Sequence, residues 1–129
     1  MSLDEQQRPL YEVKAGLFKG LSHPFRIRIL ELLADGHEHT VTALQEATGL
    51  EASHLSQHLS VLRKHQLVVS TRRASHVYYL IAFPEVADLL TVARTLLGCI
   101  VNTTHIHYDH LTDLPTLPPT TTQTDRPTP

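Results

Sequence analysis

The sequence lacks the residue types that stabilise small secreted or cysteine-rich zinc domains. Its 129 residues include one cysteine, Cys99, and no tryptophan. One cysteine cannot form an internal disulfide or a cysteine-rich zinc module, which fits a reducing cytosol. No run of about 20 apolar residues is present, so we expect no membrane span. The polar start MSLDEQQRPL is unlike a secretion signal. We therefore expect a one-domain cytoplasmic protein.

Acidic residues are missing from one long stretch of the chain. Between Glu51 and Glu85 there is no aspartate or glutamate. The stretch does contain four basic residues: Arg63, Lys64, Arg72 and Arg73. The net charge of the chain is −2, so subtracting the +4 of this stretch leaves −6 on the remainder. This segregation predicts a face for a polyanion; chance clustering on a solvated surface is the alternative.

The first half of the chain has the periodicity of three helices. One pattern begins near Pro9, and Ser22 is expected to cap a second helix with Pro24 in its first turn. The second helix should form the buried centre, because it is apolar on most sides: Phe25, Ile27, Ile29, Leu30, Leu32 and Leu33. A short third helix is expected between Thr40 and Gly49, with three residues inward: Val41, Leu44 and Ala47.

The second half predicts a polar-faced helix, a hairpin and a long apolar helix. A fourth helix is expected from Leu50 to His65, with its apolar stripe at Ala52, Leu55, Leu59 and Leu62. The runs 67–71 and 77–81 are rich in β-branched and aromatic residues, which is typical of a β-hairpin. A fifth helix begins at Pro84 and extends past Cys99. The fold class is therefore mainly α with a small β-hairpin, arranged as a winged helix-turn-helix.

Composition divides the chain into three segments. Residues 1–8 are polar and expected to be flexible. Residues 9–111 are expected to form the winged helix-turn-helix domain with its dimerisation helices. Residues 112–129 are rich in threonine and proline, so we expect a disordered tail.

The fourth predicted helix has the residue types of a helix that reads DNA. Its polar positions hold serine, histidine and glutamine, whereas an ordinary amphipathic surface helix, the alternative, usually carries many Glu and Lys residues. Gln57 can pair with an adenine edge, and serines can pair with several bases. The residues predicted to bind DNA are Ser53, His54, Ser56, Gln57, His58, Ser60, Arg63 and Lys64. Arg63 and Lys64 lie at the C-terminal end of the helix, which is expected to touch phosphates.

The predicted hairpin tip is basic. It offers four residues to the DNA backbone or the minor groove: Arg72, Arg73, Ser75 and His76. A solvated turn without a ligand is the alternative. The DNA-facing region also contains four histidines whose protonation near about pH 6 should tighten DNA binding: His54, His58, His65 and His76.

The fifth predicted helix is apolar on too many sides for one small domain to cover. Pairing with a second copy would bury it and place two recognition helices in successive major grooves. Packing wholly on its own domain is the alternative. The predicted homodimer interface comprises Leu10, Leu17, Leu89, Leu90, Ala93, Leu96, Leu97 and Ile100.

Three motifs resemble the ArsR/SmtB-type regulators. The stretch LFKGLSHPFRIRILELL is similar to the family's opening, GLEASHLSQHLSVLRKHQLV to its recognition helix, and RRASHVYYLI to its arginine-rich wing. The resemblance covers about Tyr11 to Leu97. It implies a dimeric repressor of a two-fold symmetric operator, often released by a metal ion or another small signal. Two departures are Glu51, where the family usually has a capping serine, and Ala74, where its wing usually turns on glycine. A left-handed alanine costs about 1 kcal/mol or more, so we expect another loop shape there.

Candidate metal ligands are few. The family's thiolate site on the third helix has no cysteine here, and Asp88 is followed by leucines rather than by the Asp-x-His of the fifth-helix site. Four residues near the C-terminus remain: His105, His107, Asp109 and His110. Such donors suit zinc or nickel, and His37 and His39 could join them. The alternative is a solvated helix end that binds nothing, so we expect no required cofactor. Cys99 fits a small core residue, with a redox sensor as its alternative.

The combined prediction is a sequence-specific DNA-binding regulator that represses transcription from an inverted-repeat operator in the cytoplasm, at the nucleoid. A winged-helix adaptor that binds another protein and not DNA is the alternative. An enzyme is not expected, because the sequence has no glycine-rich phosphate loop, nucleophile elbow or acid–base pair on one element, and therefore no catalytic residues.

Overall fold

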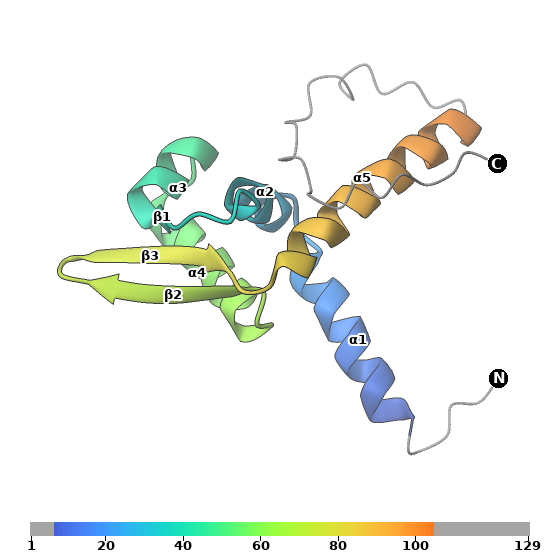
Figure 1. The fold of residues 1–129 in the computed structure, drawn as a ribbon, viewed down its shortest axis with the longest axis horizontal. Coiled ribbons are helices and arrows are strands. Elements are labelled where there is room, and N and C mark those ends of the chain that lie inside the picture. Colours follow the sequence, from blue (N-terminus) through green and yellow to red (C-terminus); the bar gives the residue numbers. More distant parts are fainter. Residues whose placement is uncertain (1–6, 105–129) are drawn as a thin grey trace.

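The computed structural model describes residues 7–104. It contains five helices and three strands, in the order α1 (Arg8–Leu21), α2 (Pro24–Leu33), β1 (His39–Thr40), α3 (Val41–Thr48), α4 (Ala52–Lys64), β2 (Val68–Arg73), β3 (His76–Ile81) and α5 (Pro84–Thr104). Figure 1 shows the β2–β3 hairpin extending from one side of the body and α1 and α5 projecting from the other. The predicted winged helix-turn-helix is confirmed, with one more strand than expected.

The three strands form an antiparallel sheet in the order β1-β3-β2. β1 pairs His39 with Tyr79 and Thr40 with Tyr78. Sequence periodicity missed this strand because two residues are too few to show alternation. The sheet joins the start of α3 to the hairpin, so the wing is attached to the body along β3 as well as at its base.

The hairpin has longer strands and a tighter turn than expected. β2 and β3 pair from Val68↔Ile81 out to Arg73↔His76, which leaves only Ala74 and Ser75 in the turn. Ala74 adopts the left-handed conformation, with φ 55°. The expectation that alanine would force another loop shape is therefore wrong. A two-residue hairpin turn needs a positive φ, and pairing of the flanking strands compensates for the strain.

The core lies where α2, α3 and α4 meet the sheet and the start of α5. Its most buried side chains are Ile29, Leu30, Leu33, Leu44, Leu55, Leu59, Leu62, Leu67, Val68, Ile81, Val86 and Leu90. Three residues expected inside are exposed: Phe25 at 39%, Ile27 at 38%, and Ala47. A short helix can turn only part of its circumference to the core, so apolar positions on its other side stay in solvent.

Helix ends follow the sequence signals with one shift. Thr40 caps α3, and Gly49 ends it with φ 71°, as expected. The cap of α2 is His23 and not Ser22, because extended His23 lets its ring nitrogen Nδ1 accept from the Phe25 backbone N–H at 3.1 Å.

The helices at the two ends of the described chain differ slightly from their expected bounds. α1 already includes Arg8, which corrects the expected flexible segment 1–8 by one residue, and α5 continues to Thr104. The rest of that segment, the end of the expected domain to residue 111 and the tail 112–129 lie outside the described residues.

Candidate nucleic-acid interface

The exposed side of α4 carries unoccupied polar side chains. Leu55, Leu59 and Leu62 are buried and fix the helix on the core. Five predicted DNA-reading residues are exposed on the remaining surface: Ser53, His54, Ser56, Gln57 and Ser60. Within residues 7–104, the three serines and Gln57 make no side-chain hydrogen bond. Their donors and acceptors are therefore available to base edges.

The turn before α4 has the geometry of a helix-turn-helix. α3 ends at left-handed Gly49, and only Leu50 and Glu51 separate this glycine from the start of α4 at Ala52. The Glu51 side chain makes no capping hydrogen bond. Its exposed carboxylate is favourable at a helix N-terminus but repels phosphate, so this position limits how closely the helix start approaches the DNA backbone.

His58 does not belong to the DNA-facing surface. Its ring lies 4.3 Å, centroid to centroid, from the ring of His23 at the start of α2, and 6.1 Å from Phe25. Partial burial, with smaller contributions from His23, Arg26 and His54, lowers the pKa of His58. The prediction that His58 contacts DNA is therefore not supported by its position. It lies one turn after His54, on the side of α4 that packs against α2.

His65 also points inward, toward α1. A Cβ placed on Gly20 would lie 2.9 Å from the His65 ring, and Gly20 is buried. Of the four histidines expected to gain positive charge near DNA, His54 and His76 are exposed. The expected tightening of DNA binding in acid can therefore rest on those two only.

The basic residues of the interface lie at the end of α4 and along the hairpin. Arg63 and Lys64 are exposed in the last turn of α4, and Arg63 Nη1 donates to Ser70 Oγ on β2 at 3.3 Å. Arg72, Ser75 and His76 are exposed. The Arg63–Ser70 contact joins the end of α4 to β2, so the helix and the hairpin are neighbours. A single duplex could therefore contact both elements.

The side chain of Arg73, unlike that of Arg72, is bound by another residue of the protein. Its Nη2 donates to Glu38 Oε2, and its guanidinium carbon lies 4.1 Å from the centroid of the Tyr78 ring. The hydrogen bond to Glu38 raises the pKa of Arg73. Sequence reasoning missed this contact because Glu38 is brought to the hairpin by β1, which was not predicted.

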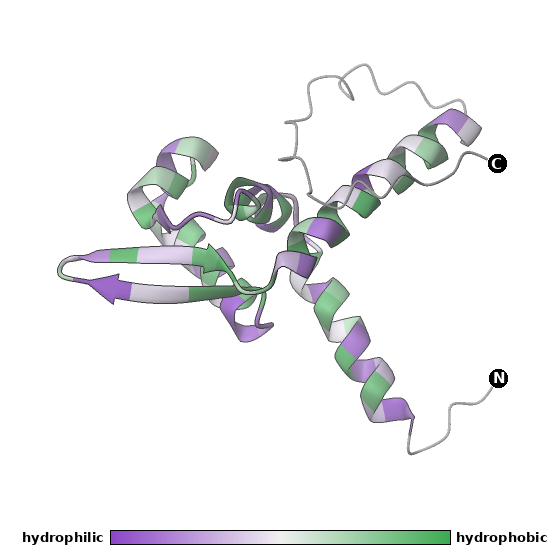
Figure 2. Cartoon of the chain, viewed as in Figure 1, coloured by the Kyte–Doolittle hydropathy of each residue, from purple (hydrophilic) through white to green (hydrophobic). Residues whose placement is uncertain are grey.

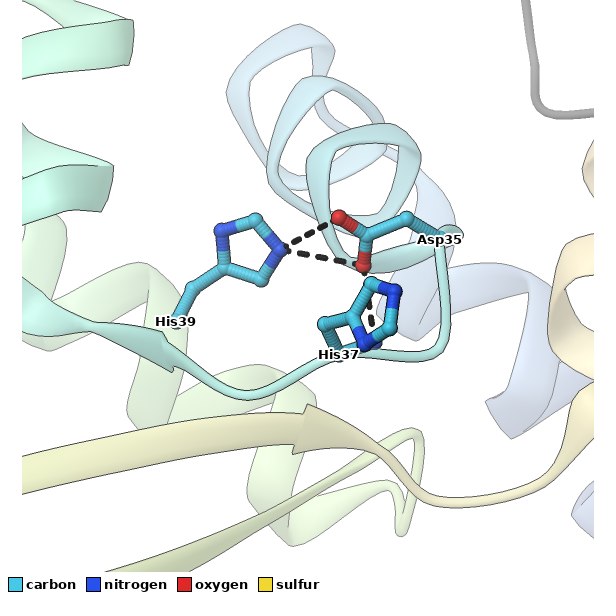
Figure 3. Close-up of polar contacts among 3 residues, drawn as sticks. All are labelled: Asp35, His37 and His39. Atoms are coloured by element: carbon cyan, nitrogen blue, oxygen red, sulfur yellow. Dashed lines mark hydrogen bonds and ion pairs between the residues drawn. The ribbon is translucent and has the colours of Figure 1, made fainter.

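Asp35, His37 and His39 form a local polar cluster between α2 and α3 (Figure 3). His39 Nε2 lies 2.9 Å from Asp35 Oδ2, and the His37 backbone N–H donates to Oδ1 at 2.8 Å. Burial alone would raise the pKa of Asp35, but these hydrogen bonds and the two histidines lower it. The contacts thus stabilise the loop before β1, with the His37 contact made by backbone.

No group of three potential metal ligands lies together in the described part of the chain. The C-terminal candidates, His105, His107, Asp109 and His110, lie outside it. Cys99 is exposed on α5, so its interpretation as a core residue is wrong.

α1 and α5 project from the side of the body opposite the hairpin and contain many apolar residues (Figure 2). Leu10 and Phe18 on α1 are 56% and 59% exposed, and Leu96 on α5 is 57% exposed. Other exposed apolar residues of the two helices are Tyr11, Val13, Val92, Leu97 and Ile100. Eight large apolar side chains exposed on two helices are typical of a protein–protein contact surface.

The predicted interface residues fall into two groups. Leu90 is 7% exposed and belongs to the chain's own core, and Leu17 packs against that core. The assignment of Leu90 to a dimer interface is corrected because its side chain is already buried in the chain's own core. Leu17 is half-buried, so its assignment stays a prediction. Leu10, Ala93, Leu96, Leu97 and Ile100 are exposed, and Leu89 is half-buried.

An apolar groove of about 370 Å³ lies between α1, α2 and α5. Phe18, Ile27 and Leu97 line it, and Glu31 is the acidic residue at its wall. Burial raises the pKa of Glu31, opposed by Arg28 and Arg94. The groove continues the exposed apolar surface of the two projecting helices.

By length and composition alone, residues Pro84–Thr103 could cross a membrane, with a mean hydropathy of 1.4. This corrects the expectation that no segment is long and apolar enough. One such helix is weak evidence, because helices that pack on protein pass the same test. Here Val86 and Leu90 pack on the core, and Asp88 is exposed on the same helix. The absence of a membrane span stays a prediction.

Comparison with known proteins supports this architecture. A family model described as a helix-turn-helix domain matches residues 21–71, from the end of α1 into β2. Rv0081 of Mycobacterium tuberculosis (strain H37Rv), an uncharacterized HTH-type transcriptional regulator, is 44% identical over 97 residues, or 75% of this chain and 85% of that protein. Its crystal structure has a TM-score of 0.69 at 45% identity and covers 74% of this chain and 96% of that one.

Two further relatives carry more specific descriptions. The solution structure of Mb0332 from Mycobacterium bovis is a homodimeric winged helix-turn-helix DNA-binding domain of a possible ArsR-family regulator. It matches with a TM-score of 0.69 and 29% identity over 84% of this chain and 97% of that one. The biofilm growth-associated repressor of Xylella fastidiosa (strain Temecula1) is 31% identical over 96 residues, or 74% of this chain and 82% of that protein.

Proposed function

The chain belongs to the ArsR family of winged helix-turn-helix transcriptional regulators, which are not enzymes, and we propose that it represses transcription by binding an inverted-repeat operator as a homodimer. One observation carries the proposal. The unoccupied serine and glutamine face of α4 lies beside a basic hairpin, in a stretch without acidic residues. Base edges are read by such side chains, and phosphates by the arginines and lysine around them.

The exposed apolar surfaces of α1 and α5 support the homodimer. They lie opposite the hairpin, so pairing them leaves both α4 faces and both wings free for DNA. A two-fold axis through these helices would present two copies of α4 to half-sites about 34–36 Å apart. The homodimeric state of Mb0332 is consistent with this arrangement.

The proposal includes no required cofactor and places the protein in the cytoplasm with the DNA it regulates. Zinc or nickel bound by His105, His107, Asp109 and His110 would act as a modulating signal. DNA binding measured after chelation, and again with added zinc or nickel, tests both parts. Loss of DNA binding after chelation would contradict the absence of a required cofactor, and DNA binding unchanged by added metal would contradict a modulating metal.

A salt titration tests DNA binding itself. A duplex selected from a random library would be titrated with the protein at several salt concentrations, followed by fluorescence anisotropy. Each neutralised phosphate should contribute about −0.9 to the slope of log affinity against log salt. A slope near zero, as a protein-binding adaptor would show, would refute the proposal.

A substitution of Gln57 tests whether α4 reads base edges. Gln57→Ala should weaken binding to the selected duplex by about 5- to 150-fold per contact, because a bidentate contact contributes about 1–3 kcal/mol of discrimination. Binding to random DNA should change little. Asn102→Ala, at an exposed position of α5, is the matched control. Equal losses on both DNAs would show that Gln57 does not read bases.

A further inference from the structure

Glu38 and Arg73 are brought together by the sheet across 35 residues of sequence. Glu38 lies just before β1, and β1 pairs with the central strand β3. Arg73 is the last residue of β2, beside the turn, and pairs with His76 of β3. The ion pair therefore connects the loop after α2 to the outer end of the wing.

The two neighbouring wing arginines are in different states. Arg72 is exposed, and within residues 7–104 its side chain makes no hydrogen bond or ion pair. Arg73 is held by Glu38 and lies over the Tyr78 ring. Successive strand residues point to opposite faces, so only one of the two can reach the loop that carries Glu38.

A carboxylate and a phosphate offer arginine the same chemistry. Both present anionic oxygens that accept charge-assisted hydrogen bonds from the guanidinium fork. Glu38 takes up the Nη2 end of the Arg73 fork, and its negative charge repels a phosphate that approaches the same guanidinium. Full engagement of the Arg73 fork by phosphate is therefore opposed by Glu38.

We propose that Glu38 occupies Arg73 in the DNA-free protein as an intramolecular substitute for phosphate, and so lowers the affinity of the wing for duplex DNA. This inference rests on the proposed DNA binding. It makes Glu38, an acidic residue outside the recognition helix and wing, a determinant of DNA affinity. Arg72 is then the wing arginine that engages DNA at first contact.

The expected effect follows from counterion release. Glu38→Gln frees one arginine per protomer, so the salt slope should steepen by about 0.9 per protomer and about 1.8 per dimer. At about 0.15 M salt this corresponds to tighter binding by about 5-fold per protomer, or up to about 30-fold per dimer.

The experiment uses the full chain and a random-sequence duplex of about 30 base pairs, followed by anisotropy over a salt series. The matched control is Glu12→Gln, which removes the same charge and frees Arg8 from its ion pair on α1, away from the wing. Glu38→Gln is also combined with Arg73→Gln and, separately, with Arg72→Gln. Circular dichroism and thermal unfolding verify that each variant is folded.

The result expected is tighter binding by Glu38→Gln than by Glu12→Gln, retained with Arg72→Gln and lost with Arg73→Gln. If Glu38→Gln binds no more tightly than Glu12→Gln, the inference is overturned while DNA binding stands. Weaker binding by Glu38→Gln also overturns it, because Glu38 would then be orienting Arg73 for DNA. Absence of salt-dependent binding by the unaltered protein would overturn the proposed function as well.

Discussion

Replacing Gly20 by alanine tests how tightly α1 is joined to the DNA-binding body. An added Cβ at Gly20 would lie 2.9 Å from His65 Cγ and Cδ2 and 3.0 Å from His65 Cβ. These atoms are next to the backbone at the end of α4, so they cannot swing aside as a flexible side-chain tip could. Forcing a methyl group into such a contact costs about 1–3 kcal/mol.

Gly16 provides the matched control on the same helix. A Cβ there would lie 4.0 Å from the His65 ring, an ordinary contact distance. Gly16→Ala should therefore raise the free energy of unfolding by up to about 1 kcal/mol, the difference in helix propensity. Gly20→Ala brings the same gain in helix propensity, but the close contact with His65 costs more. It should therefore lower the free energy of unfolding by about 1 kcal/mol.

The assay is urea unfolding followed by circular dichroism, at one protein concentration, because the proposed dimerisation would make stability concentration-dependent. A difference of about 2 kcal/mol between the two variants is expected, or roughly 8–16 °C in Tm for a domain of this size. His65→Ala added to Gly20→Ala should relieve the close contact and reduce this difference. If Gly20→Ala is as stable as Gly16→Ala, the close packing of α1 on α4 is refuted.

Three further predictions concern the recognition helix, the wing and α5. Partial burial lowers the pKa of His58, so the unfolded chain is protonated first and the free energy of unfolding should fall as pH falls through about 6.5. Thermal unfolding of His58→Gln should depend less steeply on pH. A pH profile identical to that of the unaltered protein would contradict the burial argument. Ala74→Gly should raise the free energy of unfolding by about 0.5 kcal/mol, which is the cost of a left-handed alanine minus the entropy that glycine adds to the unfolded chain. Ser75→Gly should lower the free energy of unfolding. Equal effects of the two substitutions in urea unfolding would rule out strain at Ala74. Leu96→Glu should shift a dimer toward monomer in sedimentation, with Thr95→Glu as the exposed control on the same helix; a shift in both or neither would remove the apolar face of α5 as the cause.

Most of the helical architecture could be predicted from the sequence because its signals are local. Thr40 and Gly49 bound α3 as expected, and the stripe of Leu55, Leu59 and Leu62 is buried as expected. Amphipathic spacing and capping act within one or two turns, so they can be read without knowing what packs nearby.

Most errors about the candidate site come from contacts between distant segments. His58 looks like another polar residue of α4, and only the position of α2 shows that it packs on His23. Arg73 looks as available as Arg72 until β1 brings Glu38 beside it. Leu90 and Leu96 are both apolar residues of one helix, and the direction of the core decides which is buried. Tertiary geometry sets these assignments.

The central strand β3 also connects the wing directly to α5. β3 borders both other strands and enters α5 after only two residues, Ala82 and Phe83. In the proposed homodimer, a ligand that tilted one α5 against its twin would therefore shift the hairpin through this short connection. A hairpin of six-residue strands is about 20 Å long, so a tilt of about 10° passed through β3 would displace its tip by about 3–4 Å. That movement is enough to separate an arginine from a phosphate oxygen. An inducer bound far from the duplex would in this way weaken the contact between the wing and DNA.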